Sequence, residues 1–148
     1  MLRSAVDGDA EPLTGVYLRS RGAAMPWLVS PHDEASTLRW FKHVVLAEQQ
    51  VWVAVSGDRL LGFAAVDGQS LEQLYIDPDD QGHGIGRALL DAAKEASPSG
   101  LSLHIFTRND RARLFYESAG FTLVEQRDGS GNEEREPDCI YSWPLRTV

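Results

Sequence analysis

The sequence predicts a mixed α/β domain built around a central sheet. Segments of helical period and segments of strand period follow each other along the 148 residues. Consecutive apolar segments in the middle are separated by short turns, which indicates hairpin strands and excludes strict alternation of strands and helices. The length fits one domain with a single core, so we expect residues 1–148 to form one domain.

The N-terminal third is predicted to contain two helices. The stretch "LRSAV" can form a short strand, and a first helix begins near Asp9. A second helix is expected over "SPHDEASTLRWFKHVVLAEQ". Ser30 can cap this helix, Pro31 occupies its first position, and the acidic Asp33 suits its positive end.

The rest of the chain alternates strands with two further helices. The segments expected as strands are 51–55, 60–66, 71–76, 101–106, 121–127 and 139–143. Helices are expected over 86–96 and 109–120, the second capped by Asn109 and ended by Gly120. These elements predict a mixed sheet of six to seven strands flanked by about four helices.

Composition excludes several classes of protein. Cys139 is the single cysteine, which excludes an intrachain disulfide and a thiolate metal cluster, and we expect it to be a buried strand residue without metal or catalytic role. No apolar run could cross a membrane and the N-terminus carries no signal pattern, so we expect a cytoplasmic protein with no membrane partner. The net charge of −8 disfavours nucleic acid and suits a cationic substrate such as an amine.

The stretch "QGHGIGRALL" (81–90) carries the strongest local signal. Its glycine spacing matches neither the dinucleotide fingerprint nor the P-loop, which disfavours a nucleotide-binding protein. Glycines allow backbone N–H groups to approach an anion, the helix start adds positive charge, and Arg87 supplies a guanidinium. By itself the segment is either a diphosphate site or a tight turn between a strand and a helix.

The wider sequence resembles the GNAT superfamily of N-acetyltransferases. In that family Gln/Arg-x-x-Gly-x-Gly/Ala follows a strand, as Gln81, Gly84 and Gly86 do within "LEQLYIDPDDQGHGIGRALL". A second signature places a Tyr seven residues after an Asn and just before a Gly-Phe step, as Asn109 and Tyr116 stand in "RNDRARLFYESAGF". The resemblance covers roughly residues 50–145. It implies a GNAT fold whose sheet is splayed in the middle, with acetyl-CoA as co-substrate.

The resemblance also implies roles for individual residues. The loop and helix amides that would bind the CoA pyrophosphate are those of Gly82, His83, Gly84, Ile85, Gly86 and Arg87. The strand edge that would pair with the pantetheine arm consists of Leu74, Tyr75 and Ile76. Asn109 would contact the cofactor near its acetyl end, and Tyr116 would lie near the sulfur.

Transfer of an acetyl group to an amine needs a base, a donor for the oxyanion and an acid for the leaving thiolate. Tyr116 is the candidate acid, and a backbone N–H at the splayed strand can serve the oxyanion. Three candidates for the base stay open. They are Glu72, which period 2 places on the strand face of Leu74 and Ile76 unless a bulge changes the parity, His104 on the next strand, and a water relay.

The acceptor side is less specified. The stretch "RSRGAAMPW" and His32 are candidates for substrate contact. The acidic run "GSGNEEREPD" is either a solvated loop or a wall in which Glu133, Glu134 or Asp138 attracts an amine. A similar run occurs in bacterial family members whose acceptors are unassigned.

The sequence therefore predicts a cytoplasmic acetyl-CoA-dependent N-acetyltransferase. The acceptor is a primary amine of a small molecule, a protein N-terminus or a lysine, which attacks directly in a ternary complex. The alternative is a non-catalytic acyl-CoA-binding module. Family members often dimerise, so a homodimer is compatible with the resemblance, although no feature of the sequence indicates one.

Overall fold

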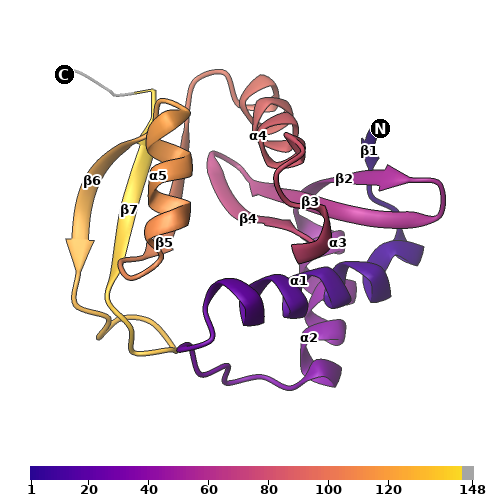
Figure 1. Ribbon diagram of the computed structural model, residues 1–148, viewed down its shortest axis with the longest axis horizontal. Coiled ribbons are helices and arrows are strands. Elements are labelled where there is room, and N and C mark those ends of the chain that lie inside the picture. The colour runs from indigo at the N-terminus through magenta and orange to yellow at the C-terminus, as the bar shows by residue number, and fades with distance from the viewer. Residues whose placement is uncertain (145–148) are drawn as a thin grey trace.

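Seven strands form one mixed sheet in the order β1-β2-β3-β4-β5-β7-β6 in the computed structural model, which describes residues 1–144 (Figure 1). The strands are β1 (Leu2–Ser4), β2 (Gln50–Ser56), β3 (Arg59–Asp67), β4 (Ser70–Ile76), β5 (Leu101–Phe106), β6 (Thr122–Arg127) and β7 (Asp138–Trp143). All neighbouring strands pair antiparallel except β4 and β5, which run parallel. The predicted mixed sheet is confirmed.

The sheet is split between β4 and β5. In the part of the chain that the structure describes, these strands pair at one position, Ser70 opposite Ser102. A hydrogen bond from Ser102 N–H to the Gln69 carbonyl (2.8 Å) closes this end. Toward Ile76 and Phe106 the two strands separate, so the sheet opens as a V, as Figure 1 shows. The predicted splay in the middle of the sheet is therefore confirmed.

Four helical regions among residues 1–144 cover the two faces of the sheet. They are α1 (Ala10–Ala24), α2 with a π-helical turn and α3 (Glu34–Trp40, Phe41–Val45 and Leu46–Glu48), α4 (Ile85–Ala96) and α5 (Asp110–Ser118). One buried cluster joins α4 and α5 to the sheet, and a second cluster joins α1 and α2 to the opposite face.

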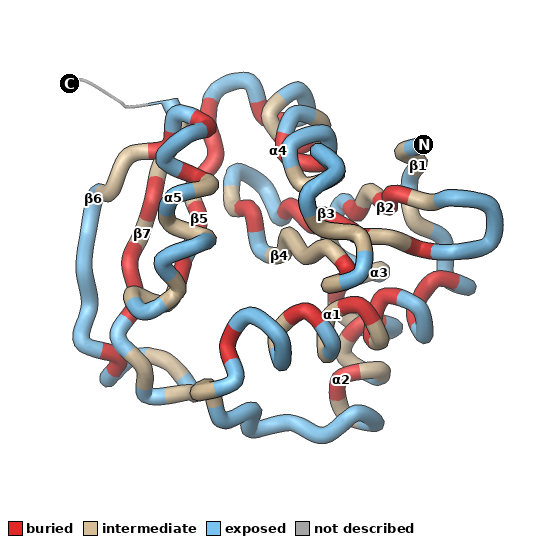
Figure 2. Tube along the Cα trace, viewed as in Figure 1, coloured by how far each residue is buried: buried red, intermediate tan, exposed pale blue. Residues whose placement is uncertain are grey.

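Strand β3 is buried on both of its faces. Phe63 and Ala65 belong to the cluster under α1 and α2, whereas Ala64 and Val66 belong to the cluster under α4 and α5. This alternation follows from the period of 2 along a strand and explains why its sequence is apolar without interruption. In Figure 2 the buried residues follow the inner strands, while the β2–β3 turn and the glycine loop before α4 are exposed.

The start of the second helix differs from the prediction. The helix begins at Glu34, and its N-cap is Asp33, whose Oδ1 accepts from Ser36 N–H at 2.7 Å. Ser30 instead donates to the His32 carbonyl in the preceding loop, so the prediction that Ser30 caps the helix was wrong. Asp33 is the N-cap because its carboxylate accepts from a backbone N–H of the first turn and, as an anion, also interacts favourably with the helix dipole.

Strand β4 contains a bulge that changes the predicted face of Glu72. Ala65 pairs with Gln73 and Val66 with Leu71, so Glu72 is the additional residue and is exposed. Leu71, not Glu72, joins Leu74 in the cluster under α4. The prediction that Glu72 shares a face with Leu74 was therefore wrong, because a bulge inserts one residue into the alternation.

Two further findings concern Cys139 and the helices. Cys139 is fully buried in β7, as predicted. No helix within residues 1–144 is long and apolar enough to cross a membrane.

Candidate active site

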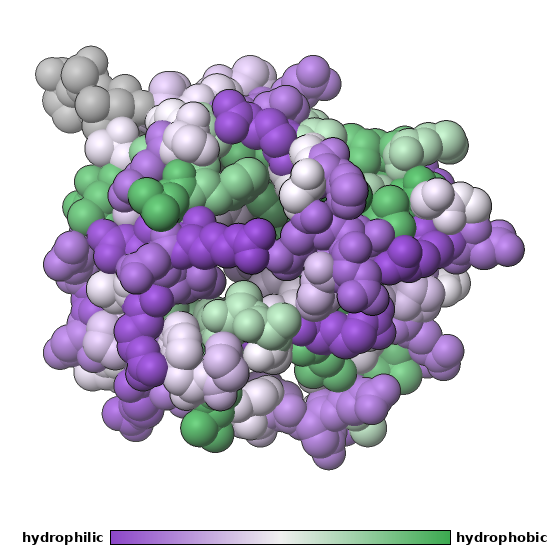
Figure 3. Space-filling view, viewed as in Figure 1, coloured by the Kyte–Doolittle hydropathy of each residue, from purple (hydrophilic) through white to green (hydrophobic). Residues whose placement is uncertain are grey.

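A cavity of about 410 Å³ lies at the open end of the V. Its walls come from α1, β4, the glycine loop, the start of α4, and α5. The lining residues are Ser20, Ala23, Ala24, Met25, Leu74, Tyr75, Ile76, Asp80, Gln81, Gly82, Gly84, Ile85, Gly86, Arg87, Asn109, Arg111, Ala112, Phe115 and Tyr116. Figure 3 shows that the surface is hollowed near the middle of this face. All predicted cofactor-binding residues except His83 line this one cavity.

The glycine loop brings backbone donors to the cavity. Gly82 and Gly84 have φ angles of 85° and 79°, a left-handed conformation that side chains other than glycine rarely adopt. Gly84 is the N-cap of α4, and Ala88 N–H donates to its carbonyl at 3.1 Å. The preceding helical amides, Ile85 to Arg87, have no carbonyl within the helix and carry its positive dipole end. The loop is therefore built to receive an anion.

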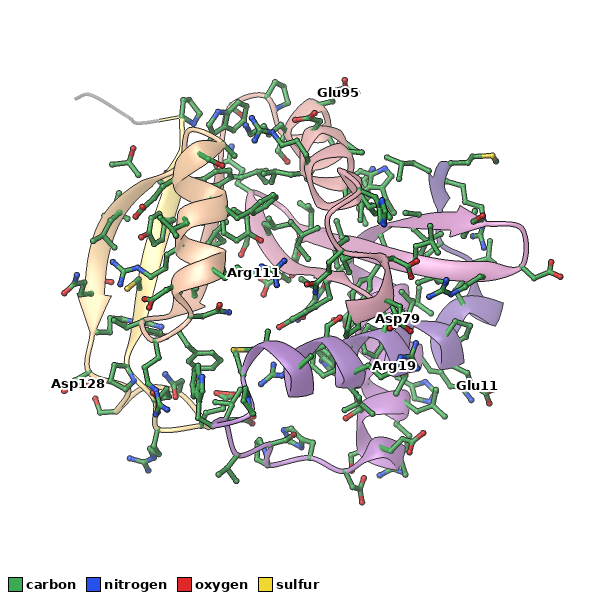
Figure 4. All side chains as sticks on the ribbon, in the orientation of Figure 1. Glu11, Arg19, Asp79, Glu95, Arg111 and Asp128 are labelled. Atoms are coloured by element: carbon green, nitrogen blue, oxygen red, sulfur yellow. The ribbon has the colours of Figure 1, made fainter. Side chains whose placement is uncertain are left out.

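An ion pair with Asp77 ties this loop to α1. Arg19 donates to Asp77 Oδ2 from Nη2 (2.6 Å) and Nε (3.1 Å), and Asp79 N–H donates to Asp77 Oδ1 at 3.1 Å. In Figure 4, Arg19 on α1 lies beside Asp79. Burial alone would raise the pKa of Asp77, but the Arg19 guanidinium and the Asp79 N–H hold it below its ordinary value. Asp77 thus fixes the position at which the chain leaves β4.

The free edge of β4 offers backbone groups to the gap. Asp77 N–H donates to the Leu61 carbonyl at 2.8 Å, which fixes the phase of the β3–β4 ladder. Because hydrogen bonding alternates along an antiparallel pair, the N–H groups of Leu74 and Ile76 are directed away from β3. The Ile76 carbonyl accepts from Ser20 Oγ at 2.6 Å and from Gln81 Nε2 at 3.4 Å.

Helix α5 contributes the two residues of the second sequence signature. Asn109 Oδ1 caps the helix by accepting from Ala112 N–H at 3.3 Å, which confirms the predicted cap. Tyr116 is 8% exposed, and its ring packs edge-on against Phe115 and Phe121. Burial, and secondly the proximity of Tyr75, raises the pKa of Tyr116 above its ordinary value. The phenol therefore keeps its proton at neutral pH.

The two side chains predicted as candidate bases lie outside the cavity. Glu72 is exposed at the β4 bulge, and His104 is exposed on β5, where it pairs with Ile140 of β7. His83 is also exposed, and its side chain does not line the cavity. Of the three candidate bases for the proton of the acceptor amine, only the water relay requires neither Glu72 nor His104.

The predicted acceptor-side residues fall into separate environments. Asp138 is buried and accepts from Arg127 at 2.7 and 2.8 Å, so its carboxylate anchors the β6–β7 connection. Glu133 contacts His32 at 3.0 Å, with both side chains exposed. Glu134 is half-buried and acts electrostatically on Arg21. The predicted contact segment "RSRGAAMPW" includes Arg21 and supplies four cavity residues, Ser20, Ala23, Ala24 and Met25.

Arg111 and Tyr17 are two residues in or near the cavity that were not predicted from the sequence. Arg111 lines the cavity and lies on the side of α5 that faces the gap (Figure 4). Tyr17 was missed as well. Its ring lies 5.3 Å from that of Tyr75, and its hydroxyl accepts from Arg21 at 2.7 Å. The spacing of Tyr17 and Arg21, one helical turn apart, was the available signal.

Comparison with known proteins gives the family. The chain matches the family model described as "Acetyltransferase (GNAT) domain" over residues 47–123. The chain belongs to the GNAT acetyltransferases. The family and the class of enzyme predicted from the sequence, an acyltransferase, are thereby confirmed.

Two relatives with a named activity cover most of the chain and of their own length. Peptidyl-lysine N-acetyltransferase YjaB of Escherichia coli (strain K12) is 31% identical over 124 residues, covering 83% of this chain and 82% of the relative. Peptidyl-lysine N-acetyltransferase YiaC of the same organism is 27% identical over 147 residues, covering 98% and 97%.

Solved structures share the fold. The solution structure of apo YjaB from Escherichia coli has a TM-score of 0.79 at 27% identity and covers 97% of this chain and 96% of that one. The PaiA N-acetyltransferase of Thermoplasma acidophilum, solved in complex with coenzyme A, has a TM-score of 0.76 at 22% identity and covers 96% of each chain. The GNAT fold of this chain therefore agrees with its sequence relatives.

Proposed function

We propose that this GNAT acetyltransferase transfers an acetyl group from acetyl-CoA to a primary amine. One observation carries the proposal: a single cavity joins an anion-binding loop, a free strand edge and the protonated phenol of Tyr116. An acyl-CoA has a diphosphate, an amide-bearing arm and a thioester in the same order. Neighbours of this fold have been solved with coenzyme A and with acetyl-CoA, which supports the choice of co-substrate.

The diphosphate would bind at the start of α4. The amides of Ile85, Gly86 and Arg87 lack partners within the helix, and the loop amides before them lie at the same end. Arg87 and Arg111 both line the cavity and bring guanidinium groups that suit phosphate oxygens. Positive charge from side chains therefore adds to that of the helix dipole.

The pantetheine arm would run along β4. Its amides can pair with the backbone groups of Leu74 and Ile76 that face the gap, so the arm would extend the sheet as an added strand. Within residues 1–144, β4 and β5 pair only at Ser70 and Ser102, so the edge of β4 beyond that position is free to pair with the arm. Asn109 would contact the arm near its acetyl end.

The reaction follows from the groups at the inner end of the cavity. The ammonium of the acceptor first loses a proton to water, and the neutral amine then attacks the thioester carbonyl. A backbone N–H of the β4 edge would donate to the oxyanion. As the C–S bond breaks, Tyr116 would donate its proton to the thiolate, and its phenolate regains a proton from the new amide nitrogen through water.

The names of the relatives support a lysine side chain as acceptor. Two of the relatives that cover most of this chain, at 31% and 27% identity, are named peptidyl-lysine N-acetyltransferases. A third relative, 24% identical, is named L-amino acid N-acyltransferase, so free amino acids are the second class of acceptor to test. We propose a peptide lysine as the acceptor of this protein.

The test has a binding stage and a turnover stage. Acetyl-CoA at a hundredfold excess over its dissociation constant should stabilise the fold by about 2.7 kcal/mol, read as a rise in melting temperature. ATP and NAD serve as controls, and a shift with either of them but not with acetyl-CoA would refute the proposed co-substrate. Thiol release across lysine peptides and amino acids then tests turnover. Binding without turnover on any amine would favour the alternative, a non-catalytic acyl-CoA-binding module.

A further inference from the structure

A second group of polar side chains lies where α1, β4 and the β6–β7 connection meet. We call Tyr17, Arg21, Tyr75 and Glu134 the Arg21 cluster. Tyr17 and Tyr75 pack in the buried cluster under α1 and α2, whereas α4 lies on the opposite face of the sheet. The Arg21 cluster therefore borders the gap from the side away from the anion-binding loop.

The position of the Arg21 guanidinium is fixed by aromatic neighbours. Nη1 donates to the Tyr17 hydroxyl at 2.7 Å, and Cζ lies 5.0 Å from the centre of the Tyr17 ring. The rings of Tyr17 and Tyr75 are 5.3 Å apart and nearly perpendicular. Tyr75 also lines the cavity. Arg21 is thus a pre-oriented group, and Tyr75 lies between its cluster and the cavity.

Arg21 differs from the paired arginines of residues 1–144 in having no carboxylate within ion-pair distance. Arg3, Arg19 and Arg127 each bind an aspartate within 2.8 Å, but within residues 1–144 no carboxylate oxygen lies within 4.0 Å of Arg21. Tyr17 and Tyr75 are hydrogen-bond partners of this half-buried guanidinium, and its planar fork of five N–H donors can bind an anion as well. Burial would lower the pKa of Arg21, but Tyr75, Tyr17 and Glu134 raise it, so the cation persists.

The β6–β7 connection brings the opposite charge to the same place. Glu134 is half-buried and acts electrostatically on Tyr17, Arg21 and Tyr75. Its neighbour Glu133 contacts His32 at 3.0 Å, so the segment after α1 lies beside this connection. A cationic and an anionic group therefore lie near each other, next to Tyr75 of the cavity wall.

We propose that Arg21 is a specificity-determining residue that binds a carboxylate of the acceptor, while Glu134 attracts its ammonium. This inference rests on the proposed N-acetyltransferase function and narrows its acceptor class. The carboxylate has two sources, an acidic side chain next to the lysine of a peptide or the α-carboxylate of a free amino acid. A guanidinium suits either one, because its planar fork matches both oxygens.

A structural role for Arg21 predicts a different result. A cation in the last turn of α1 also interacts favourably with the helix dipole and supports Tyr17. Loss of that support would lower stability and affect all acceptors alike. Specificity must therefore be measured as a ratio between acceptors.

The experiment compares acceptors that differ in one carboxylate. Peptides with a single lysine flanked by glutamate or by glutamine form one pair, and free lysine and lysine amide form the other. With the intact protein we expect a kcat/KM ratio of at least about tenfold in favour of the acid member of one pair, and which pair shows it identifies the source. Arg21→Gln should reduce that ratio to within about twofold by raising KM of the acid member, with the KM of acetyl-CoA unchanged.

Two further variants separate binding from folding. Arg21→Lys keeps the charge without the fork and should retain part of the preference. Arg39→Gln removes an exposed arginine of α2 and should leave the ratio unchanged. Equal rates for the acid and amide members in the intact protein, or an equal loss on both in Arg21→Gln, would overturn the proposal.

A binding measurement decides the inference if no acceptor is turned over. Acetylated product peptides with glutamate or glutamine beside acetyl-lysine, and N-acetylated amino acids with their amides, are titrated onto the CoA-bound protein. Tighter binding of the acid form that disappears in Arg21→Gln would support Arg21 recognition while the proposed turnover fails. Equal binding of both forms would refute the carboxylate site.

Discussion

The two sides of the cavity are built by different means. On the side of α4, the proposed cofactor contacts come mainly from backbone groups of one continuous segment, from Leu74 to Arg87. On the other side, Tyr17, Arg21, Tyr75 and Glu134 come from three separate parts of the chain and contribute side chains. The proposed cofactor side therefore depends on local conformation, and the proposed acceptor side depends on tertiary contacts.

The largest change in activity is expected for Tyr116, at the point where the two sides of the cavity meet. Tyr116→Phe removes only the hydroxyl of a buried ring, so packing against Phe115 and Phe121 should persist. Loss of the acid should lower kcat by about 100-fold, within the usual range for general acid catalysis. Steady-state thiol release measures kcat, and the KM of acetyl-CoA should hardly change.

The matched control for this prediction is another tyrosine hydroxyl. Tyr141 Oη donates to Glu117 at 2.6 Å and accepts from Arg113 at 3.1 Å, and this residue does not line the cavity. Tyr141→Phe should lower stability with little change in kcat. A Tyr116→Phe variant that keeps kcat within threefold of the parent would show that another group, such as water, protonates the thiolate.

Backbone conformation on the cofactor side can be changed at a single residue. Gly84 has a φ of 79° and open space where a Cβ would lie, so Gly84→Ala adds backbone strain without a clash. We expect a stability loss of about 1 kcal/mol and a rise of about tenfold in the KM of acetyl-CoA. The acceptor preference should stay constant.

Gly57 supplies the control for backbone strain. It has a φ of 59° in the β2–β3 turn and equally open space. Gly57→Ala should cost similar stability and leave the KM of acetyl-CoA unchanged. If both variants raised KM alike, strain in the fold and not the anion-binding loop would be the cause.

The smallest of the three effects is expected on the acceptor side. Asp138→Asn weakens the anchor of the β6–β7 connection, where Arg127 binds the carboxylate at 2.7 and 2.8 Å. We expect the KM of the acceptor to rise about threefold to fivefold, equivalent to about 1 kcal/mol, with the KM of acetyl-CoA unchanged. The reverse pattern, a change for acetyl-CoA alone, would contradict the division into two sides.

The same variant makes a prediction about pH. The Arg127 guanidinium holds the pKa of Asp138 below its ordinary value. A carboxyl whose pKa is lowered on folding contributes stability above its unfolded pKa of about 3.9 and loses it as pH falls through the folded pKa. Asp138→Asn should therefore cost about 2 kcal/mol at pH 7, and the difference from the parent should shrink below about pH 4 in urea unfolding.

The sequence by itself determined the strands, the helices and the glycine loop. Each of these depends on periodicity, caps or glycine conformation within a short segment, as the αL conformation of Gly84 and the cap by Asn109 illustrate. The two predictions that failed were also local. Asp33 and not Ser30 is the N-cap of the second helix, and one inserted residue in β4 moved Glu72 out of the expected alternation.

Only the tertiary structure decided which side chains lie on the side of the gap away from the anion-binding loop. It separated three acidic residues of similar appearance into an anchor (Asp138), a partner of His32 (Glu133) and a neighbour of Arg21 (Glu134). Their environments depend on segments distant in sequence, and no local pattern encodes such distances. Backbone sites are specified within one segment, whereas a side-chain site requires the whole fold to bring its members together.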